Sequence, residues 1–197
     1  MTLLHRIGQK PIIAAIREPD DVQLAIESQV DHLFFMGGTV HDIIHAVRIA
    51  KKAGKGTFVH LDLIRGLSST DKEAVSFIAE YVGADGIVSP KSHQIKEAKK
   101  IGLYGVLHLF VLDSLALENG LRLANSLLPD AIELMPGVVP KVIRQFADTL
   151  DRVPIIASGL IQTVEEAAES LQAGATCLSV SSKTLWNATF TDFPQIA

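Results

Sequence analysis

Short apolar runs recur eight times along this chain, and segments with helical periodicity separate them. Near-continuous apolar strands that alternate with helices are typical of a parallel sheet covered by helices. Eight such units favour a closed (β/α)8 barrel of the TIM type over an open, doubly wound sheet. The predicted strands are 11–16, 32–37, 56–63, 86–90, 104–112, 131–136, 153–159 and 177–182. The predicted helices are 20–29, 40–53, 71–81, 93–101, 114–127, 138–150 and 164–173.

The predicted barrel takes up the whole chain, residues 1–197, as one small α/β domain with short loops. No Gly/Ser/Pro-rich linker or run of like charges divides the sequence, and this length is sufficient for one core. An open sheet that binds a dinucleotide is the alternative fold. Such a sheet normally has a G-x-G-x-x-G turn after its first strand. Because this chain continues instead with Ile16-Arg17-Glu18-Pro19, NAD is not expected.

Composition excludes several classes of protein. The mean hydropathy is +0.29, yet the apolar runs are too short to cross a bilayer. The first residues lack the apolar stretch of a secretory signal. Cys177 is the single cysteine, so no disulfide can form within the chain and no cysteine-based metal cage is expected. We therefore expect a cytoplasmic protein with no membrane partner.

The net charge of −4 argues mildly against a nucleic-acid partner, because non-specific binding to phosphates needs clustered Lys and Arg. An RNA partner would therefore need a local basic face. Lysine at the end of a helix also offsets the helix dipole, which is a purely structural explanation. The candidate RNA-binding residues gather at the end of the second predicted helix and on the fourth: Lys51, Lys52, Lys55, Lys96, Lys99 and Lys100.

Small polar residues end the last two predicted strands. Ser158-Gly159 follows one of them, and Ser181-Ser182 follows the other. In a β/α barrel, the loops after these two strands often hold a phosphate through backbone N–H groups and hydroxyls. Tight turns alone would also explain the Gly and Ser. We expect a phosphate or similar anion site here.

Charged and polar side chains also interrupt the apolar strands. His60 and Asp62 share one face of the third predicted strand, His108 lies in the fifth, and Glu133 lies in the sixth. Arg17 ends the first. Because side chains of a strand alternate in direction, and burying charge without a partner is costly, we expect these groups inside the barrel or at its mouth.

Three uses of these groups are open, besides a structural polar layer. Asp62 and Glu133 could accept hydrogen bonds from a small polyol, with Arg17 offsetting their charge. They could act as general acid and base, a role that also suits His60 or His108. The histidines and carboxylates could bind a divalent metal, although no HxH or HExxH spacing supports this, and none is predicted. Lys91, after the fourth predicted strand, adds a positive charge to the mouth or is simply solvated.

Seven segments together resemble the glycerol uptake operon antiterminator regulatory proteins, a family that responds to glycerol 3-phosphate. VHLDLIRG and IELMPGVVP are the most specific of the seven. The segments are 11–17 (PIIAAIR), 59–66 (VHLDLIRG), 86–91 (GIVSPK), 109–113 (LFVLD), 132–140 (IELMPGVVP), 155–163 (IIASGLIQT) and 173–186 (AGATCLSVSSKTLW). They follow one another over nearly the whole chain.

The resemblance implies a small β/α barrel that binds glycerol 3-phosphate as an effector, with no cofactor and no catalytic residues. It also implies binding to the leader mRNA of a glycerol operon, and it allows a homo-oligomer. The alternative is an isomerase, lyase or phosphatase that acts on a small phosphorylated polyol or sugar, because fold alone does not fix function.

Residue by residue, the resemblance places five positions at the ligand. Polar groups of the mouth fall at Arg17, Asp62 and Glu133, and the phosphate-binding strand ends fall at Gly159 and Ser181. Three positions depart from the family pattern. His108 and Lys91 stand where relatives carry arginine, and Ser158 stands where they carry glycine, so the anion site is expected to be weaker at the fourth and fifth strands.

Overall fold

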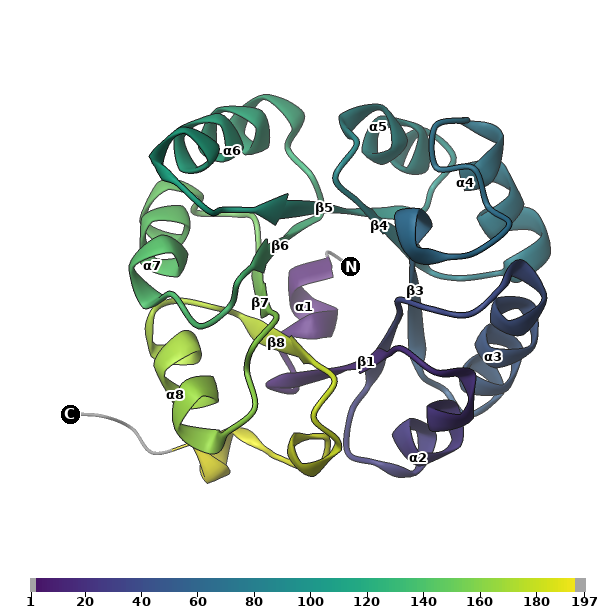
Figure 1. Cartoon of the computed structure of the whole chain (residues 1–197), viewed down its shortest axis with the longest axis horizontal. Coiled ribbons are helices and arrows are strands. Elements are labelled where there is room, and N and C mark those ends of the chain that lie inside the picture. Colours follow the sequence, from purple (N-terminus) through teal and green to yellow (C-terminus); the bar gives the residue numbers. More distant parts are fainter. Residues whose placement is uncertain (1–2, 194–197) are drawn as a thin grey trace.

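Eight parallel strands close into a ring in the order of the sequence, and β8 pairs with β1 (Figure 1). The computed structural model describes residues 3–193, and it confirms the predicted (β/α)8 barrel. The strands are β1 Ile12–Ile16, β2 His32–Phe35, β3 Gly56–His60, β4 Gly86–Ser89, β5 Tyr104–Phe110, β6 Ala131–Met135, β7 Ile155–Ser158 and β8 Cys177–Val180.

Seven helices follow the first seven strands and surround the ring (Figure 1). They are α2 Val22–Glu27, α3 Val40–Lys52, α4 Glu73–Phe77, α5 Ser92–Lys100, α6 Ser114–Leu127, α7 Pro140–Thr149 and α8 Val164–Gln172. Capping boxes at Thr39 with Asp42 and at Thr163 with Glu166 begin α3 and α8, because each side chain binds orphan N–H groups of the first turn. None of the described helices is long and apolar enough to span a membrane.

Two predicted elements differ in form. The predicted helix 71–81 is the short α4 followed by a π-helix at Ile78–Val82, which ends at Gly83 in the left-handed region. The predicted strand 56–63 ends at His60, and residues Leu61–Leu63 form a 3-10 turn. After β8 the chain makes 3-10 turns at Lys183–Leu185 and Phe190–Asp192. The short turn after β3 therefore carries Asp62 off the strand.

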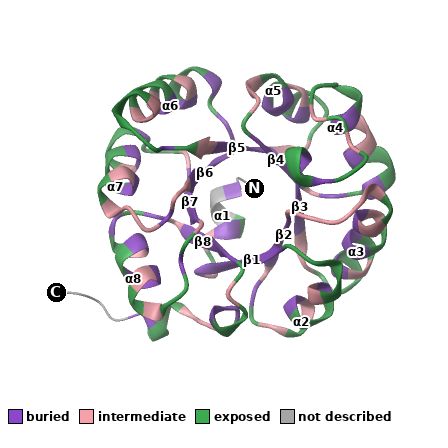
Figure 2. Ribbon diagram, viewed as in Figure 1, coloured by how far each residue is buried: buried purple, intermediate pink, exposed green. Residues whose placement is uncertain are grey.

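The strands separate two apolar cores, as their continuous burial indicates (Figure 2). Alternate residues such as Ile12 and Ala14 pack outward against the helices. The intervening side chains, among them Ile13, Phe34 and Phe58, pack together inside the ring. This two-sided burial explains why the strands are near-continuous apolar runs rather than alternating ones.

A short helix that the sequence did not predict, α1 Leu3–Ile7, is seen through the ring of strands in Figure 1. Leu3 and Ile7 are buried against the inner core, beside Phe34 and Phe58. Only four residues join α1 to β1, so α1 lies at the amino ends of the strands. It closes that end of the barrel, and the opposite end is left for polar groups.

We predict that Ile7→Ala lowers the free energy of unfolding by about 2–4 kcal/mol, because it removes buried methylene groups from beneath a closed core. Ile7 is 1% exposed. Urea denaturation measures the change, and Lys10→Ala on the following loop is the control, with an expected effect within about 0.5 kcal/mol. Equal effects of the two substitutions would show that α1 does not seal the barrel.

Candidate functional site

A cavity of about 580 Å³ opens at the carboxyl ends of the strands. His60 and His108 reach it from inside the barrel, and residues after β1, β3 and β4 form its walls. Those residues include Arg17, Asp62, Arg65 and Pro90. β/α barrels place their ligand sites at this end, so this cavity is the candidate site. Sequence reasoning missed Arg65, although it lies within the VHLDLIRG segment.

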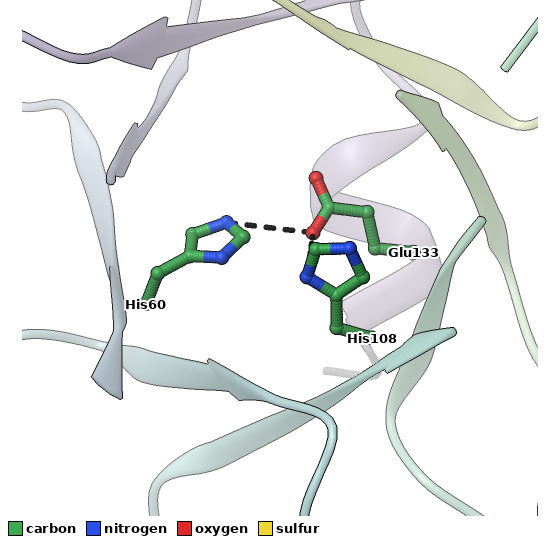
Figure 3. Close-up of side chains that lie close together, drawn as sticks. All are labelled: His60, His108 and Glu133. Atoms are coloured by element: carbon green, nitrogen blue, oxygen red, sulfur yellow. Dashed lines mark ion pairs between the residues drawn. The ribbon is translucent and has the colours of Figure 1, made fainter. Parts of the chain in front are cut away.

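Three buried side chains converge from β3, β5 and β6 inside the barrel (Figure 3). His60 Nε2 lies 3.4 Å from Glu133 Oε2, and His108 Nδ1 lies 3.4 Å from the same oxygen. The two imidazole rings meet edge to face at 84° with their centroids 5.4 Å apart. Glu133 is fully buried and is opposite His108 in the β5–β6 register. The sequence thus predicted polar residues here, but not their contact.

Burial sets the charge of this cluster. It raises the pKa of Glu133 to about 7, although the hydroxyls of Ser158 and Ser179 act in the other direction. Burial lowers the pKa of His60 to about 3, with a further lowering by His108, and lowers the pKa of His108 to about 4. Both imidazoles are therefore neutral at pH 7, so the 3.4 Å contacts are not ion pairs unless a histidine takes up a proton.

Several polar atoms of this layer have no hydrogen-bond partner in the described part of the chain. They are His60 Nε2, His108 Nε2, both carboxyl oxygens of Glu133, and the hydroxyls of Ser158 and Ser179. The two hydroxyls lie near enough to Glu133 to lower its pKa, but not in ordinary hydrogen-bond geometry. Buried polar groups are normally hydrogen-bonded, so these atoms can take hydrogen bonds from water or from a bound molecule.

A second, smaller cavity of about 30 Å³ lies between the ends of β7 and β8. Its walls include Ser158, Gly159 and Ser181, together with Arg17. The structure therefore brings four of the sequence-predicted ligand residues to one spot. Ser182 does not line it, and its hydroxyl hydrogen-bonds that of Thr184 at 2.9 Å. Ser179 also lines this cavity, and the alternation within the eighth predicted strand could have identified it.

The two cavities adjoin, because Arg17, Met36 and Met135 line both of them. Gly159 has φ +79°, which favours glycine. A Cβ atom at Gly159 would lie 2.9 Å from Met135 Cγ. The lack of a side chain at this position thus keeps the backbone and Met135 close together at the junction of the two cavities.

Asp62 and Lys91 form an ion pair at the opposite wall. Lys91 Nζ lies 2.7 Å from Asp62 Oδ1, and the hydroxyls of Ser69 and Ser89 donate to the same carboxylate at 2.7 and 3.0 Å. Burial alone would raise the pKa of Asp62, but the hydrogen bonds from Lys91 and the two serines, with the charge of Lys91, lower it. Asp62 is therefore ionised, and a ligand hydroxyl would compete with Lys91 for it.

Five of the predicted RNA-binding lysines lie at the other end of the barrel, at or just after the carboxyl ends of α3 and α5, because helices of a β/α barrel run opposite to its strands; Lys96 lies in the middle of α5. Four of them have intramolecular partners: Lys51 pairs with Asp85 at 2.6 Å, Lys100 with Glu97 at 3.3 Å, and Lys55 and Lys99 donate to backbone carbonyls. Among the described residues, Lys52 and Lys96 make no such contact. Their role in RNA binding stays a prediction.

The raised pKa of Glu133 predicts a pH-dependent stability. Its carboxyl binds its proton more tightly in the folded chain, with a pKa of about 7 against an ordinary value of 4.5. Its stabilising contribution is fully present below pH 4.5 and is lost as the pH rises to 7, a change on the order of 3 kcal/mol. The lowered pKa values of His60 and His108 have the opposite effect, because their contribution to stability is lost as the pH falls below the ordinary histidine value of 6.5. Burial raises the pKa of Cys177, so that thiol stays neutral.

We predict that Glu133→Gln becomes progressively more stable than the wild type between pH 5 and pH 8, because the amide needs no proton to stay neutral. Urea denaturation across this range, in buffer with EDTA, measures the difference. Subtraction of the two profiles removes the part of the histidine contribution that is common to both proteins. A difference that does not change with pH would contradict the raised pKa of Glu133.

The fold and the position of the cavities define a β/α barrel whose candidate site lies at the carboxyl ends of its strands. The model of the glycerol-3-phosphate responsive antiterminator family matches residues 12–186. The chain therefore belongs to this family. A relative in Escherichia coli strain K12, the uncharacterized protein YgcP, is 34% identical over 186 residues, which cover 94% of this chain and 96% of the relative.

Two solved structures agree with this assignment. The glycerol uptake operon antiterminator regulatory protein of Listeria monocytogenes is 31% identical, with a TM-score of 0.83 over 89% of this chain and 94% of that one. A glycerol uptake operon antiterminator-related protein of Thermotoga maritima is 36% identical, with a TM-score of 0.80 over 91% and 99%. Deoxyribose phosphate aldolase of Aeropyrum pernix, at 16% identity and a TM-score of 0.71 over 91% and 88%, shares the fold.

Proposed function

We propose that this chain is a cytoplasmic transcription antiterminator that binds glycerol 3-phosphate as its effector and the leader mRNA of a glycerol operon. The observation that carries the proposal is the family match over residues 12–186. The names of the Listeria and Thermotoga relatives, which refer to a glycerol uptake operon, support the same function. Glycerol 3-phosphate acts in this proposal as a regulatory ligand that the chain does not transform.

The adjoining cavities suit the two ends of this ligand. The phosphate group would occupy the small cavity, where Ser158, Gly159 and Ser181 offer backbone N–H groups and hydroxyls and Arg17 offers a positive charge. The glycerol hydroxyls would extend past Met36 and Met135 into the large cavity. A single ligand would in this way contact the ends of β7 and β8 and also the imidazoles of His60 and His108.

The polyol end has several partners within the large cavity. Neutral His60 and His108 can each donate one hydrogen bond and accept another. Asp62 can accept a hydrogen bond from the ligand if its ion pair with Lys91 opens. Glu133 lies beneath the imidazoles and does not line the cavity, so its proposed effect on the ligand passes through them. Lys91 would contribute charge rather than direct contact while it stays paired with Asp62.

We predict that glycerol 3-phosphate raises the thermal midpoint of the wild type by mass action, while glycerol at equal concentration has little effect. Gly159→Leu should abolish the shift, because its side chain would collide with Met135 at the junction of the cavities. Gly54→Leu is the matched control. Gly54 has the same left-handed backbone, with φ +78°, and open space around its Cβ position.

Differential scanning fluorimetry of the wild type, Gly159→Leu and Gly54→Leu, with each of the two ligands, measures these shifts. The two leucine variants carry a similar backbone strain, so they should differ in their response to the ligand and not in folding alone. Equal shifts with glycerol and glycerol 3-phosphate, or a full shift in Gly159→Leu, would place the phosphate elsewhere.

We predict that glycerol 3-phosphate and leader RNA tighten each other's binding by the same factor, because coupling free energies are reciprocal. With a net charge of −4, RNA affinity should rest on a local basic patch and fall as salt increases. Lys52→Glu with Lys96→Glu should weaken RNA binding and leave ligand affinity unchanged. Lys72→Glu with Lys141→Glu is the control, because it alters the net charge equally at exposed positions elsewhere.

Gel shifts of a glycerol-operon leader RNA, with and without ligand, measure the coupling, and calorimetry measures the ligand affinity. Equal weakening by the two double variants would show that net charge, and not this patch, sets RNA affinity. The absence of any ligand-dependent shift would contradict the regulatory function.

An enzyme acting on a small phosphorylated polyol or sugar is the second candidate, and one observation favours it. Glu133, with a pKa of about 7, lies beside two neutral histidines under the cavity, and such a group can serve as a general acid or base. No lysine lies in β1–β8, so an aldolase that forms a Schiff base on a strand lysine is disfavoured. Measured turnover of a phosphorylated triose, without RNA binding, would favour the enzyme.

A further inference from the structure

A cluster of three buried side chains inside the barrel is not needed for holding a phosphate between β7 and β8. His60, His108 and Glu133 each direct a potential ligand atom to the same point inside the barrel (Figure 3). These atoms all lie within 4.8 Å of one another, and all three side chains are buried. No metal-binding spacing is visible in the sequence, because the three residues come from three different strands.

The distances within the cluster suit a shared ion better than direct hydrogen bonds. The Glu133 Oε2 atom lies 3.4 Å from His60 Nε2 and 3.4 Å from His108 Nδ1. A nitrogen and an oxygen that share a hydrogen bond are usually about 2.9 Å apart. Two ligand atoms on a tetrahedral ion, each about 2.05 Å from it, are roughly 3.4 Å apart.

The polar atoms at this point also have no partner within the described residues. His60 Nε2 and both carboxyl oxygens of Glu133 are buried and make no hydrogen bond. His108 approaches Glu133 through Nδ1, and its other ring nitrogen, Nε2, is also buried and unpaired. A polar layer that served only to fill the barrel would satisfy its own members, since an unpaired buried polar group costs about 1–3 kcal/mol. A cation would satisfy the carboxylate and an imidazole nitrogen from each histidine.

We propose that His60, His108 and Glu133 bind one divalent transition-metal ion inside the barrel. Two imidazole nitrogens and one carboxylate oxygen are a ligand set for Zn²⁺, whereas Mg²⁺ and Ca²⁺ prefer oxygen ligands alone. His60 and His108 line the large cavity, so the fourth position of the ion faces it and is open to water or to an oxygen atom of a bound molecule. The carboxylate of Glu133 offsets part of the charge of the ion.

The proposed metal site rests on the contacts among these three side chains, and its test needs neither RNA nor glycerol 3-phosphate. Its test uses the full chain, stripped of metal by dialysis against a chelator and then titrated with Zn²⁺ by calorimetry. We expect saturable binding of one equivalent per chain and a Zn²⁺-dependent rise in the thermal midpoint. Co²⁺ should substitute and show the visible absorption of a four-coordinate site without thiolate.

Single variants assign the ion to this cluster. His60→Gln, His108→Gln and Glu133→Gln should each weaken Zn²⁺ binding by at least about 100-fold, because loss of a direct ligand should exceed the 10–100-fold loss typical of outer partners. His93→Gln is the matched control. His93 is an exposed histidine at the start of α5, and its loss should leave Zn²⁺ affinity unchanged.

Loss of Zn²⁺ binding must be distinguished from loss of folding. Circular dichroism of each metal-free variant shows whether it folds, and any one folded variant of the cluster suffices for the comparison. Loss of Zn²⁺ binding in a folded cluster variant, with retention in His93→Gln, supports the site. The proposal is overturned if the stripped wild type binds no equivalent of Zn²⁺ or Co²⁺, or if any folded variant of the cluster binds Zn²⁺ as tightly as the wild type.

Discussion

In a closed barrel, every inward-pointing side chain shares one interior, and the rest of this molecule depends on how that interior is filled. Phe34 and Phe58 fill the interior toward the amino ends of the strands, where α1 packs against them and closes the barrel. Polar side chains are therefore confined to the carboxyl end, where β/α barrels place their sites. The apolar filling also removes water from below the polar layer, and this desolvation raises the pKa of Glu133 and lowers those of His60 and His108.

The polar layer and the β7–β8 loops divide the mouth of the barrel into two chemically distinct parts. One part is small and offers Ser158, Gly159, Ser181 and Arg17. The other is large, with neutral imidazoles at its base. Two histidines and a buried carboxyl leave polar atoms at the boundary that are unpaired within the described residues. In the proposed function, the anion occupies the small part and the rest of the ligand extends into the large one.

The sequence predicted the barrel well because each strand is buried on both faces and reads as a short apolar run, while the longer helices are amphipathic and carry a helical period. It did not predict α1, a five-residue helix whose stability comes from packing beneath the barrel. It placed Asp62 on a strand, although a 3-10 turn follows His60. It named His60, His108 and Glu133 but not their contact, because β3 and β5 are not neighbours and their approach depends on closure of the ring.

The chain belongs to a family named for its response to glycerol 3-phosphate, and the account places the phosphate of this ligand between β7 and β8. A crystal structure of the chain with glycerol 3-phosphate tests that placement most directly. The account predicts a phosphate within hydrogen-bond distance of the backbone of Ser158–Gly159 and of Ser181, with the hydroxyls directed toward His108. A ligand bound at the amino end of the barrel, or in the large cavity without contact to Gly159, would contradict it.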